Sequence, residues 1–464
     1  MPVVPYGACV TAEAVRRRGH QAQLVDLMFQ QDPARTVIRE LRRHRPDVVG
    51  ISVRNLDNND MFQPTEYVSE LEGLVAVIRK ETEVPVVLGG SAVAVMPEAL
   101  LRVTGANFAV LGDGEFVYPL LLEALTNGDG LGAIPRVAWI DDGKYRVNDG
   151  SPLALQSCPE LISPDYHRWI DVRAYSSRMA TIPLQSKRGC PFPCVYCTYG
   201  VSEGLDYRLY QPEQVAEAIS RLASKGLRDI EFVDNVFNSP YEHALEVCRQ
   251  VALQNDRVRL QTVEINPQFL DRNLLEAMKD AGFVGMGITA ESAADPVLTG
   301  LAKGYNAGHV HRAAEAILAT DLPCLWLFLL GGPGETKETV LETVNFATGV
   351  LRPGDAAFFN VGIRIYPGTE LEKIAGRENI LKKEHDNMIY PIFYFSPELD
   401  PKWTLDLLHQ TARKHRSILY SALSLNHPFM PFINRVASSV GLSQPLWRHT
   451  SRIRGLLKFM GQDI

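Results

Sequence analysis

Continuous apolar runs alternate with amphipathic stretches along residues 1–140 of the chain. The apolar runs cover residues 47–53, 84–90 and 108–112. They lack the polar alternation of a strand with one solvated face, and so predict strands that are covered on both sides. The amphipathic segments predict helices over 8–18, 33–43, 65–81 and 97–104. This alternation predicts an α/β domain with an open, parallel, doubly wound sheet of the flavodoxin or Rossmann type, which binds ligands beyond the carboxyl ends of its strands.

The start of the chain departs from this pattern. Residues 1–7 read Met-Pro-Val-Val-Pro-Tyr-Gly, which resembles the loop and helix that follow a first strand. The missing strand would be central in a doubly wound sheet. We therefore expect either a true start upstream of Met1 or an unusually built sheet.

Strand–helix alternation resumes after residue 180. Strands are predicted over 181–187, 229–234, 259–265, 283–290, 322–330 and 356–365, with helices such as 212–225 and 272–281 between them. Asp-Gly and Ser-Pro turn pairs over 141–180 predict a linker with a short hairpin. We therefore divide the chain into an N-terminal domain (1–140), a linker (141–180), a second α/β domain (181–375) and a helical C-terminal region (376–464).

Composition narrows the class of protein. The chain has 464 residues, 46% hydrophobic and 22% charged, which predicts a soluble globular protein of two or three domains. A net charge of -7 gives no overall field that favours nucleic acid. Seven cysteines over this length do not form a disulfide framework. The start lacks a signal-peptide pattern, and the longest apolar run, 322–330, is too short to span a bilayer, so we expect a cytoplasmic protein.

Three cysteines, Cys190, Cys194 and Cys197, lie in the stretch Cys-Pro-Phe-Pro-Cys-Val-Tyr-Cys. Cys thiolates ligate iron–sulfur clusters, and three of them can hold three irons of a four-iron cube. Without a fourth Cys, one iron keeps an open position at which substrate chemistry can occur. The alternative is a structural zinc site, which usually takes four ligands. No Cys or His lies near enough in sequence to complete a zinc knuckle, and a distant fourth ligand stays open.

The C-x3-C-x2-C spacing, with the aromatic Tyr196 before the last Cys, resembles the radical S-adenosylmethionine (SAM) enzymes. The resemblance implies a partial (β/α)6 barrel and a [4Fe–4S] cluster whose open iron is chelated by SAM. It also implies SAM-binding roles for strand-end residues, namely Asp234, Asn235, Glu291, Ser292 and Arg364. Carboxylates suit the ribose diol and ammonium of SAM, and an Arg fork suits its carboxylate. A solvated loop charge or a helix cap is the alternative for each acid.

Three strand ends in the first domain resemble the cobalamin-binding domains that precede some radical SAM barrels. The residues concerned are Arg54, Asn55, Asp57, Gly89, Gly90, Ser91, Gly112, Asp113, Gly114 and Glu115. The resemblance implies that the small residues 89–91 line a slot for the nucleotide tail and that loop 54–57 lies under the corrin. The chain has no Asp-x-His-x-x-Gly motif, so we expect no protein histidine below the cobalt. The alternative is a flavodoxin-like domain that has lost its ligand.

The resemblance covers residues 2–370 and implies a cobalamin-dependent radical SAM C-methyltransferase. Its product would be a methylated secondary-metabolite intermediate, for instance a heteroaromatic such as a pyrrole of an antibiotic. One alternative is a cobalamin-dependent radical SAM cyclase or oxidoreductase that transfers no methyl group, and another is a non-catalytic sensor. Methylthiotransferases are disfavoured, because they carry a second N-terminal cysteine set and only Cys9 and Cys158 precede the Cys loop. The expected partners are a small-molecule substrate, free or tethered to a carrier protein, and an electron donor of the flavodoxin or ferredoxin type.

The remaining cysteines and the tail are less informative. Cys9, Cys158, Cys248 and Cys324 are expected to be core or incidental thiols. After residue 412, eight Lys and Arg face one acid, with apolar residues interleaved. This predicts a solvated helical face over a core, or else a docking surface for an acidic partner, a membrane or an anionic substrate.

Overall fold

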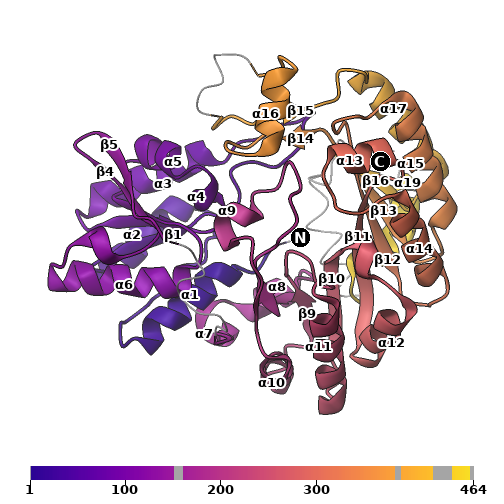
Figure 1. The fold of residues 1–464 in the computed structure, drawn as a ribbon. Helices are drawn as coiled ribbons and strands as arrows, with labels where there is room; N and C mark the ends of the chain where they lie inside the picture. The colour runs from indigo at the N-terminus through magenta and orange to yellow at the C-terminus, as the bar shows by residue number, and fades with distance from the viewer. Residues whose placement is uncertain (1, 151–159, 382–387, 422–441, 460–464) are drawn as a thin grey trace.

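The computed structural model describes residues 2–150, 160–381, 388–421 and 442–459. It has two lobes, each built around one large sheet, and Figure 1 shows the N-terminal lobe at the left and the larger lobe at the right. Two small two-stranded sheets complete the strands, β7 (Lys187–Arg188) with β8 (Arg208–Leu209) and β14 (Ile363–Arg364) with β15 (Phe393–Tyr394). The predicted α/β fold class is confirmed.

The N-terminal lobe contains a five-stranded sheet in the order β1-β2-β3-β4-β5. Its strands are β1 (Val49–Ser52), β2 (Val86–Gly89), β3 (Phe108–Val110), β4 (Val137–Asp141) and β5 (Lys144–Val147). The first three are parallel, whereas β4 pairs antiparallel with β3 and with β5. The β4–β5 hairpin thus belongs to this sheet, which continues to Val147, past the predicted boundary at residue 140. The hairpin joins the sheet because Phe108 of β3 pairs with Trp139 of β4.

The helices of this lobe follow the predicted alternation. They are α1 (Tyr6–Arg17), α2 (Pro33–His44), α3 (Val68–Glu81), α4 (Ser91–Val95), α5 (Pro97–Thr104), α6 (Gly114–Asn127) and the 3-10 turn η1 (Leu131–Ala133). No strand precedes α1 among the described residues, and β1 forms an edge of the sheet. Gly50 and Ser52 of β1 are exposed, as expected of an edge strand. Among the described residues, β1, β2 and β3 are therefore parallel although the central first strand of a doubly wound fold is not found.

The larger lobe contains a seven-stranded parallel sheet in the order β16-β13-β12-β11-β10-β9-β6. Its strands are β6 (Ile182–Leu184), β9 (Asp229–Phe232), β10 (Arg259–Ile265), β11 (Phe283–Glu291), β12 (Cys324–Leu330), β13 (Ala356–Val361) and β16 (Ile418–Tyr420). The six predicted strands appear in sequence order, and the edge strands β6 and β16 do not pair, as in a partial barrel. The seventh strand, β16, corrects the expectation of a purely helical C-terminal region, because residues 418–420 pair with β13.

Helices cover the outer face of the barrel sheet (Figure 1). The helices of this part of the chain before β13 are α7 (Tyr166–Trp169), α8 (Val172–Ser176), α9 (Tyr199–Glu203), α10 (Pro212–Ser224), α11 (Tyr241–Gln254), η3 (Pro267–Phe269), α12 (Arg272–Asp280), α13 (Asp295–Gly300), α14 (Ala307–Leu318) and α15 (Lys337–Val350), of which α9 lies beside the first lobe. Those after β13 are α16 (Glu370–Arg377), α17 (Pro401–Lys414), η5 (Leu446–His449) and α19 (Thr450–Phe459). Polar caps fix several helix starts: Asp271 accepts from the Leu274 N–H at 2.9 Å, and Asp400 accepts from the Trp403 N–H at 2.8 Å.

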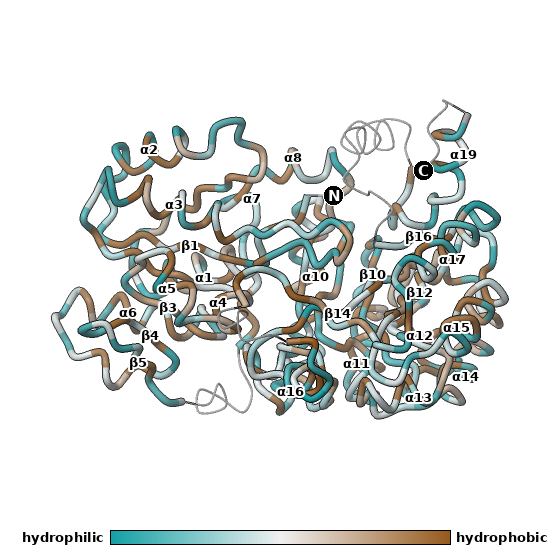
Figure 2. Tube along the Cα trace, turned by 90° about the horizontal axis from the view of Figure 1, so that it is seen from above, coloured by the Kyte–Doolittle hydropathy of each residue, from teal (hydrophilic) through white to brown (hydrophobic). Residues whose placement is uncertain are grey.

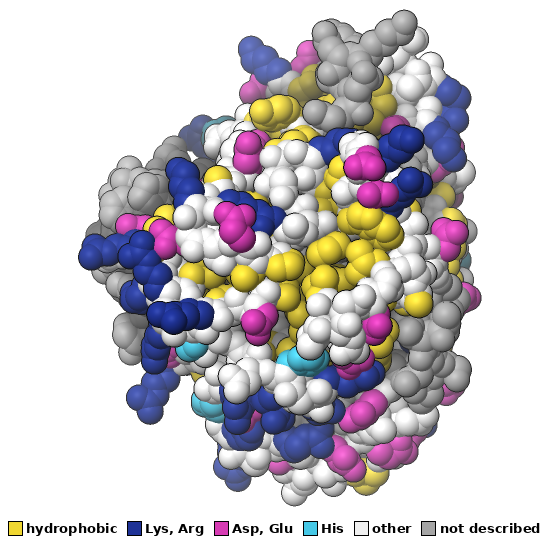
Figure 3. Space-filling model, turned by 90° about the vertical axis from the view of Figure 1, so that its left-hand side faces the viewer, with side chains coloured by type: hydrophobic (Ala, Val, Ile, Leu, Met, Phe, Trp, Pro, Cys, Tyr) yellow, Lys and Arg dark blue, Asp and Glu magenta, His cyan; other side chains and the backbone are white. Residues whose placement is uncertain are grey.

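Apolar packing joins the two lobes. One buried cluster contains Leu56 of the first lobe together with Val195 of the Cys loop and Ile363 of β14. Seen from above, hydrophobic positions follow the strands and the inner sides of helices, whereas the outer turns are hydrophilic (Figure 2). On the outer face of the first lobe, basic and acidic side chains surround smaller apolar areas (Figure 3). Among the helices of the described ranges, none has the length and apolarity needed to cross a bilayer.

Candidate cofactor and substrate site

The Cys loop connects β7 to α9 and places its three thiols on one cavity. Gly189 precedes it with φ +83°, and a Cβ there would collide with the Asp206 carbonyl oxygen, so this turn requires glycine. A backbone hydrogen bond of 3.1 Å from the Cys197 N–H to the Cys194 carbonyl tightens the loop. Cys190, Cys194 and Cys197 are free thiols and line the cavity. The sequence-predicted cluster ligands therefore lie together.

The thiols suit an iron–sulfur cluster better than a single ion. Within the described ranges, no three His, Cys, Asp or Glu side chains converge as ligands to one metal ion would. In a cuboidal cluster each thiolate binds its own iron, so convergence on one point is not required. Burial raises the pKa of Cys190 and raises that of Cys197 to about 12. Metal ligation deprotonates such thiols outright.

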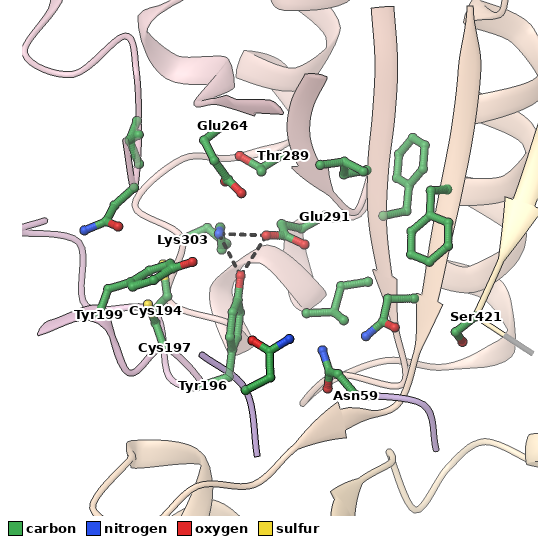
Figure 4. Close-up of a pocket in the computed structure, with 18 of the residues that line it drawn as sticks. Asn59, Cys194, Tyr196, Cys197, Tyr199, Glu264, Thr289, Glu291, Lys303 and Ser421 are labelled. Carbon is green, nitrogen blue, oxygen red and sulfur yellow. Dashed lines mark hydrogen bonds and ion pairs between the residues drawn. The ribbon is translucent and has the colours of Figure 1, made fainter. Parts of the chain in front are cut away.

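The cavity has a volume of about 720 Å³ and lies where the barrel strands end beside the first lobe. Its first-lobe side is polar and consists of Asn55, Asn58, Asn59, Asp60, Gln63, Thr65 and Tyr67. Its barrel side includes Tyr199, Asn235, Glu264, Asn266, Thr289, Glu291, Lys303, Leu327, Phe328, Leu329, Phe358, Asn360 and Ser421 (Figure 4). This volume is typical of small-molecule and cofactor sites.

Three side chains form a hydrogen-bonded group beside the thiols. Tyr196 donates to Glu291 Oε1 at 2.7 Å, and the Lys303 ammonium donates to the same oxygen at 2.9 Å and to the Tyr196 hydroxyl at 3.1 Å (Figure 4). Burial disfavours the Lys303 charge, yet Glu291 and Tyr196 hold the Lys303 pKa well above its ordinary value. Glu291 has φ +59°, a strained conformation that is common at functional sites. Its Oε2 is left to contact a ligand.

Lys303 is a site residue that the sequence analysis missed. It follows α13 and lies more than one hundred positions after the Cys loop, outside any motif. Its ammonium group has three N–H donors, of which Glu291 and Tyr196 accept two. The arrangement fits SAM, since it offers one carboxylate oxygen and a fixed cation close to the thiols that would hold the cluster.

Arg364 is not among the residues that line this cavity, so its predicted role at the SAM carboxylate stays a prediction. Its Nε donates to Asp57 at 2.8 Å, and its remaining N–H groups donate to backbone carbonyls, including that of Met388 at 2.6 Å. Asp57, predicted to lie under the corrin, is equally buried in this pair. Both residues therefore join the lobes, and the predicted cofactor role of Asp57 likewise stays a prediction.

Two further predicted SAM residues are buried within the barrel. Asp234 accepts from the Ser186 N–H at 2.7 Å and pairs with the Lys187 ammonium at 3.3 Å. Ser292 is fully buried and bonds the Thr343 hydroxyl at 3.0 Å. Both side chains are used by the fold and neither lines the cavity, so their predicted SAM roles stay predictions. The adjacent Asn235 does line the cavity and donates to Glu203 at 2.8 Å.

Asp113 and Glu115, predicted at the cobalamin site, are instead buried against two arginines of the larger lobe. Arg188 contacts Asp113 at 2.5 Å and Glu115 at 2.7 Å, and Arg208 also pairs with Asp113. Burial opposes ionisation of Asp113, but Arg188 and Arg208 hold its pKa below its ordinary value. Burial raises the Glu115 pKa. This network ties the end of β3 to the Cys loop, so it positions the lobes.

The other predicted cobalamin residues surround the ends of the first-lobe strands. Asn55 lines the cavity, and the Ser91 hydroxyl donates to the Arg54 carbonyl at 3.0 Å on the surface. Gly90 has φ +102° and lies against the backbone of Val53, with Gly89 just before it. Gly112 and Gly114 pack against Ser202 and Thr11 respectively. Only Asn55 of this set therefore reaches the cavity.

The side chains on the first-lobe side of the cavity carry hydrogen-bonding groups that suit cobalamin. Amide and hydroxyl groups can hydrogen-bond the amide side chains of a corrin. No histidine occurs among the cavity-lining residues of the described chain. Cys9, Cys248 and Cys324 are buried free thiols, as predicted, and Cys158 lies outside the described residues.

Comparison with known proteins agrees with this arrangement. The Radical SAM superfamily matches residues 184–347, and the B12 binding domain matches residues 1–122. An uncharacterized methyltransferase of Pyrococcus horikoshii is 26% identical, over 81% of this chain and 79% of its own. Tryptophan 2-C-methyltransferase of Streptomyces laurentii is 24% identical, over 80% of this chain and 72% of its own.

A solved structure shares the whole fold. The radical SAM methyltransferase TsrM from Kitasatospora setae, with cobalamin and a [4Fe–4S] cluster bound, superposes with a TM-score of 0.85 at 22% identity. The match covers 99% of this chain and 96% of TsrM. The two matched domains and the cavity between them lead to one conclusion: the chain belongs to the cobalamin-binding radical SAM enzymes.

Proposed function

We propose that this protein is a cobalamin-dependent radical SAM C-methyltransferase that transfers a methyl group from SAM to a carbon of a small molecule. The observation that carries the proposal is a single cavity lined both by the three Cys-loop thiols and by the polar loop of the B12-binding domain. A cobalt that carries methyl and a cluster that cleaves SAM would then face one substrate. The similarity to methyltransferases over four fifths of the chain supports it.

The side chains of the cavity have distinct roles in this proposal. Cys190, Cys194 and Cys197 hold the cluster, which together with SAM supplies a radical, while cobalamin supplies the methyl group. Lys303 and Tyr196 fix Glu291 by hydrogen bonds to one carboxylate oxygen, so that the other faces the bound SAM. The buried ion pairs that join the lobes keep these groups in register, since a small displacement between reacting groups is costly to the rate.

The substrate in this proposal is a secondary-metabolite intermediate with a heteroaromatic ring, free or tethered to a carrier protein. The apolar part of the cavity wall, formed by β12 and β13, offers a surface against which a flat ring can pack. A flavodoxin or ferredoxin supplies electrons to the cluster. We place the protein in the cytoplasm, because thiolates and iron–sulfur clusters require a reducing compartment.

The decisive experiment uses SAM with a deuterated methyl group. The protein is reconstituted anaerobically with iron, sulfide and cobalamin, then incubated with candidate heteroaromatic substrates. A product heavier by a methyl group that carries all three deuteriums supports the proposal. A product without added methyl mass would instead identify a cyclase or oxidoreductase. Formation of 5′-deoxyadenosine alongside the product distinguishes radical transfer from direct attack by an electron-rich carbon.

A further inference from the structure

Glu264 lies at the carboxyl end of β10 and presents its carboxylate to the cavity (Figure 4). The fold uses its backbone: the carbonyl accepts from the Phe237 N–H at 2.7 Å. Its carboxylate is different, because no donor of the described residues lies within hydrogen-bond or ion-pair distance of it. The Glu264 side chain is partly exposed to the cavity, so its carboxylate is available to accept a hydrogen bond from a ligand.

The nearest cation is already used by another acid. Lys303 donates to Glu291 at 2.9 Å, and Tyr196 donates to the same oxygen. Two carboxylates therefore share this part of the cavity with one ammonium group. Burial and the neighbouring Glu291 raise the pKa of Glu264 to about 8, as expected of an acid that lacks a positive partner. The cavity favours a ligand that brings positive charge or an N–H donor.

The same cavity has an apolar region at a fixed position relative to Glu264. Strand β11 separates β10 from β12, and β13 follows. The residues that β12 and β13 contribute to the lining are Leu327, Phe328, Leu329 and Phe358. Flat aromatic groups pack well on such side chains. The wall formed by β12 and β13 therefore favours a flat, apolar part of the ligand, while Glu264 favours a hydrogen-bond donor on the same ligand.

We propose that Glu264 is a substrate-recognition residue, which binds a nitrogen-borne donor on a substrate whose aromatic part lies against β12 and β13. The donor is a protonated amine carried beside the aromatic part. The inference rests on the proposed function, because it takes this cavity as the place where a carbon is methylated. It narrows the substrate class to aromatic nitrogen compounds whose positive charge favours the ionised form of Glu264. An anion at the same place is disfavoured, because it would repel that ionised form.

Two probes with one ring and opposite charge test the inference. Tryptamine and indole-3-propionate carry an ammonium or a carboxylate at the end of a two-carbon chain. Their affinities are measured by calorimetry on the reconstituted protein, with S-adenosylhomocysteine present so that no methyl is consumed. The wild-type protein should prefer tryptamine. Glu264→Gln, which keeps shape, should weaken tryptamine binding about tenfold or more, as expected for a hydrogen bond to a charged group.

Controls separate substrate recognition from other roles. Glu276→Gln on the exposed side of α12 should leave both probes unaffected. The affinity for S-adenosylhomocysteine should be unchanged in Glu264→Gln; a loss would assign the carboxylate to SAM and overturn the inference. Equal binding of both probes by the wild type, binding of neither, or an unaltered tryptamine affinity in the variant would also overturn it. If the wild-type protein prefers tryptamine but transfers no labelled methyl group to any substrate, the proposed function is wrong while the role of Glu264 in binding stands.

Discussion

Asp57 and Arg364 lie 307 positions apart in the chain and form a buried ion pair, with 2.8 Å between Oδ2 and Nε. Each side chain is at most 2% exposed. The pair joins the loop after β1 to strand β14, and thus the B12-binding lobe to the barrel. Asn55 and Asn58, on either side of Asp57 in the chain, line the cavity, so this contact between the lobes holds one wall of the site in place.

Arg364→Met should destabilise the protein by about 3–5 kcal/mol, because it leaves Asp57 charged and buried without a partner. Urea unfolding followed by fluorescence measures the change. The double variant Arg364→Met with Asp57→Leu should recover part of the loss, since no unpaired charge remains. Arg102→Met, which breaks the exposed pair with Glu98, is the control and should change stability little. Equal effects of the two arginine variants would contradict the interpretation.

Cys194→Ala should abolish the brown chromophore and the formation of 5′-deoxyadenosine, because the cluster loses one of three ligands. Absorbance after anaerobic reconstitution and chromatography of SAM products measure both. Cys248→Ala removes a thiol buried in α11, away from the cavity, and should keep the chromophore. Retention of colour and SAM cleavage in Cys194→Ala would remove the cluster assignment.

Lys303→Met should weaken SAM binding about tenfold or more, because Glu291 then lacks the cation that fixes it at 2.9 Å. Equilibrium dialysis with labelled SAM on the reconstituted protein gives the affinity. Lys337→Met is the matched control: this lysine lies over the Trp403 ring at 5.3 Å, outside the cavity lining. A SAM affinity that is the same in both variants would exclude Lys303 and Glu291 from SAM binding.

Glu335 should make stability fall as pH rises toward about 8. Burial raises its pKa from 4.5 to about 8, although its carboxylate accepts from the Gly331 and Gly332 N–H groups. Between pH 4.5 and about 8, the folded protein therefore keeps the Glu335 proton that the unfolded chain has already released. The stabilisation is complete below the unfolded pKa and is lost as pH rises through the folded one. Glu335→Gln should flatten the dependence, measured by urea unfolding between about pH 6 and 8.

The pH experiment has a clear control. Glu276→Gln changes an exposed acid of α12 and should keep the slope of the wild-type protein. A slope in Glu335→Gln as steep as that of the wild type would show that other groups set the dependence.

The sequence predicts the elements whose signal is local. Strand β12 is a continuous apolar run, and it forms within the predicted 322–330. The Cys spacing identifies the cluster ligands because all three lie on one loop. Strand β16 escapes prediction, since three residues after a long helix carry no pattern of their own and gain strand structure only by pairing with β13.

Roles that depend on distant partners could not be derived. Arg364 and Asp113 resemble cofactor ligands by their position at strand ends, yet each is neutralised by a charge far along the chain. Lys303 and Glu264 belong to no motif. They gain importance only because folding places one beside Glu291 and leaves the other facing the cavity without a donor.

The short strand β16 has a consequence for how such an enzyme can diversify. Ser421 follows it directly, lines the cavity, and accepts from the Val361 N–H at 3.2 Å. Ser421 thus supplies a border of the cavity from the C-terminal region, whereas the three cysteines lie on one loop more than two hundred positions earlier. Exchange of this terminal segment between relatives could retune which molecule is admitted and leave the radical-generating machinery intact.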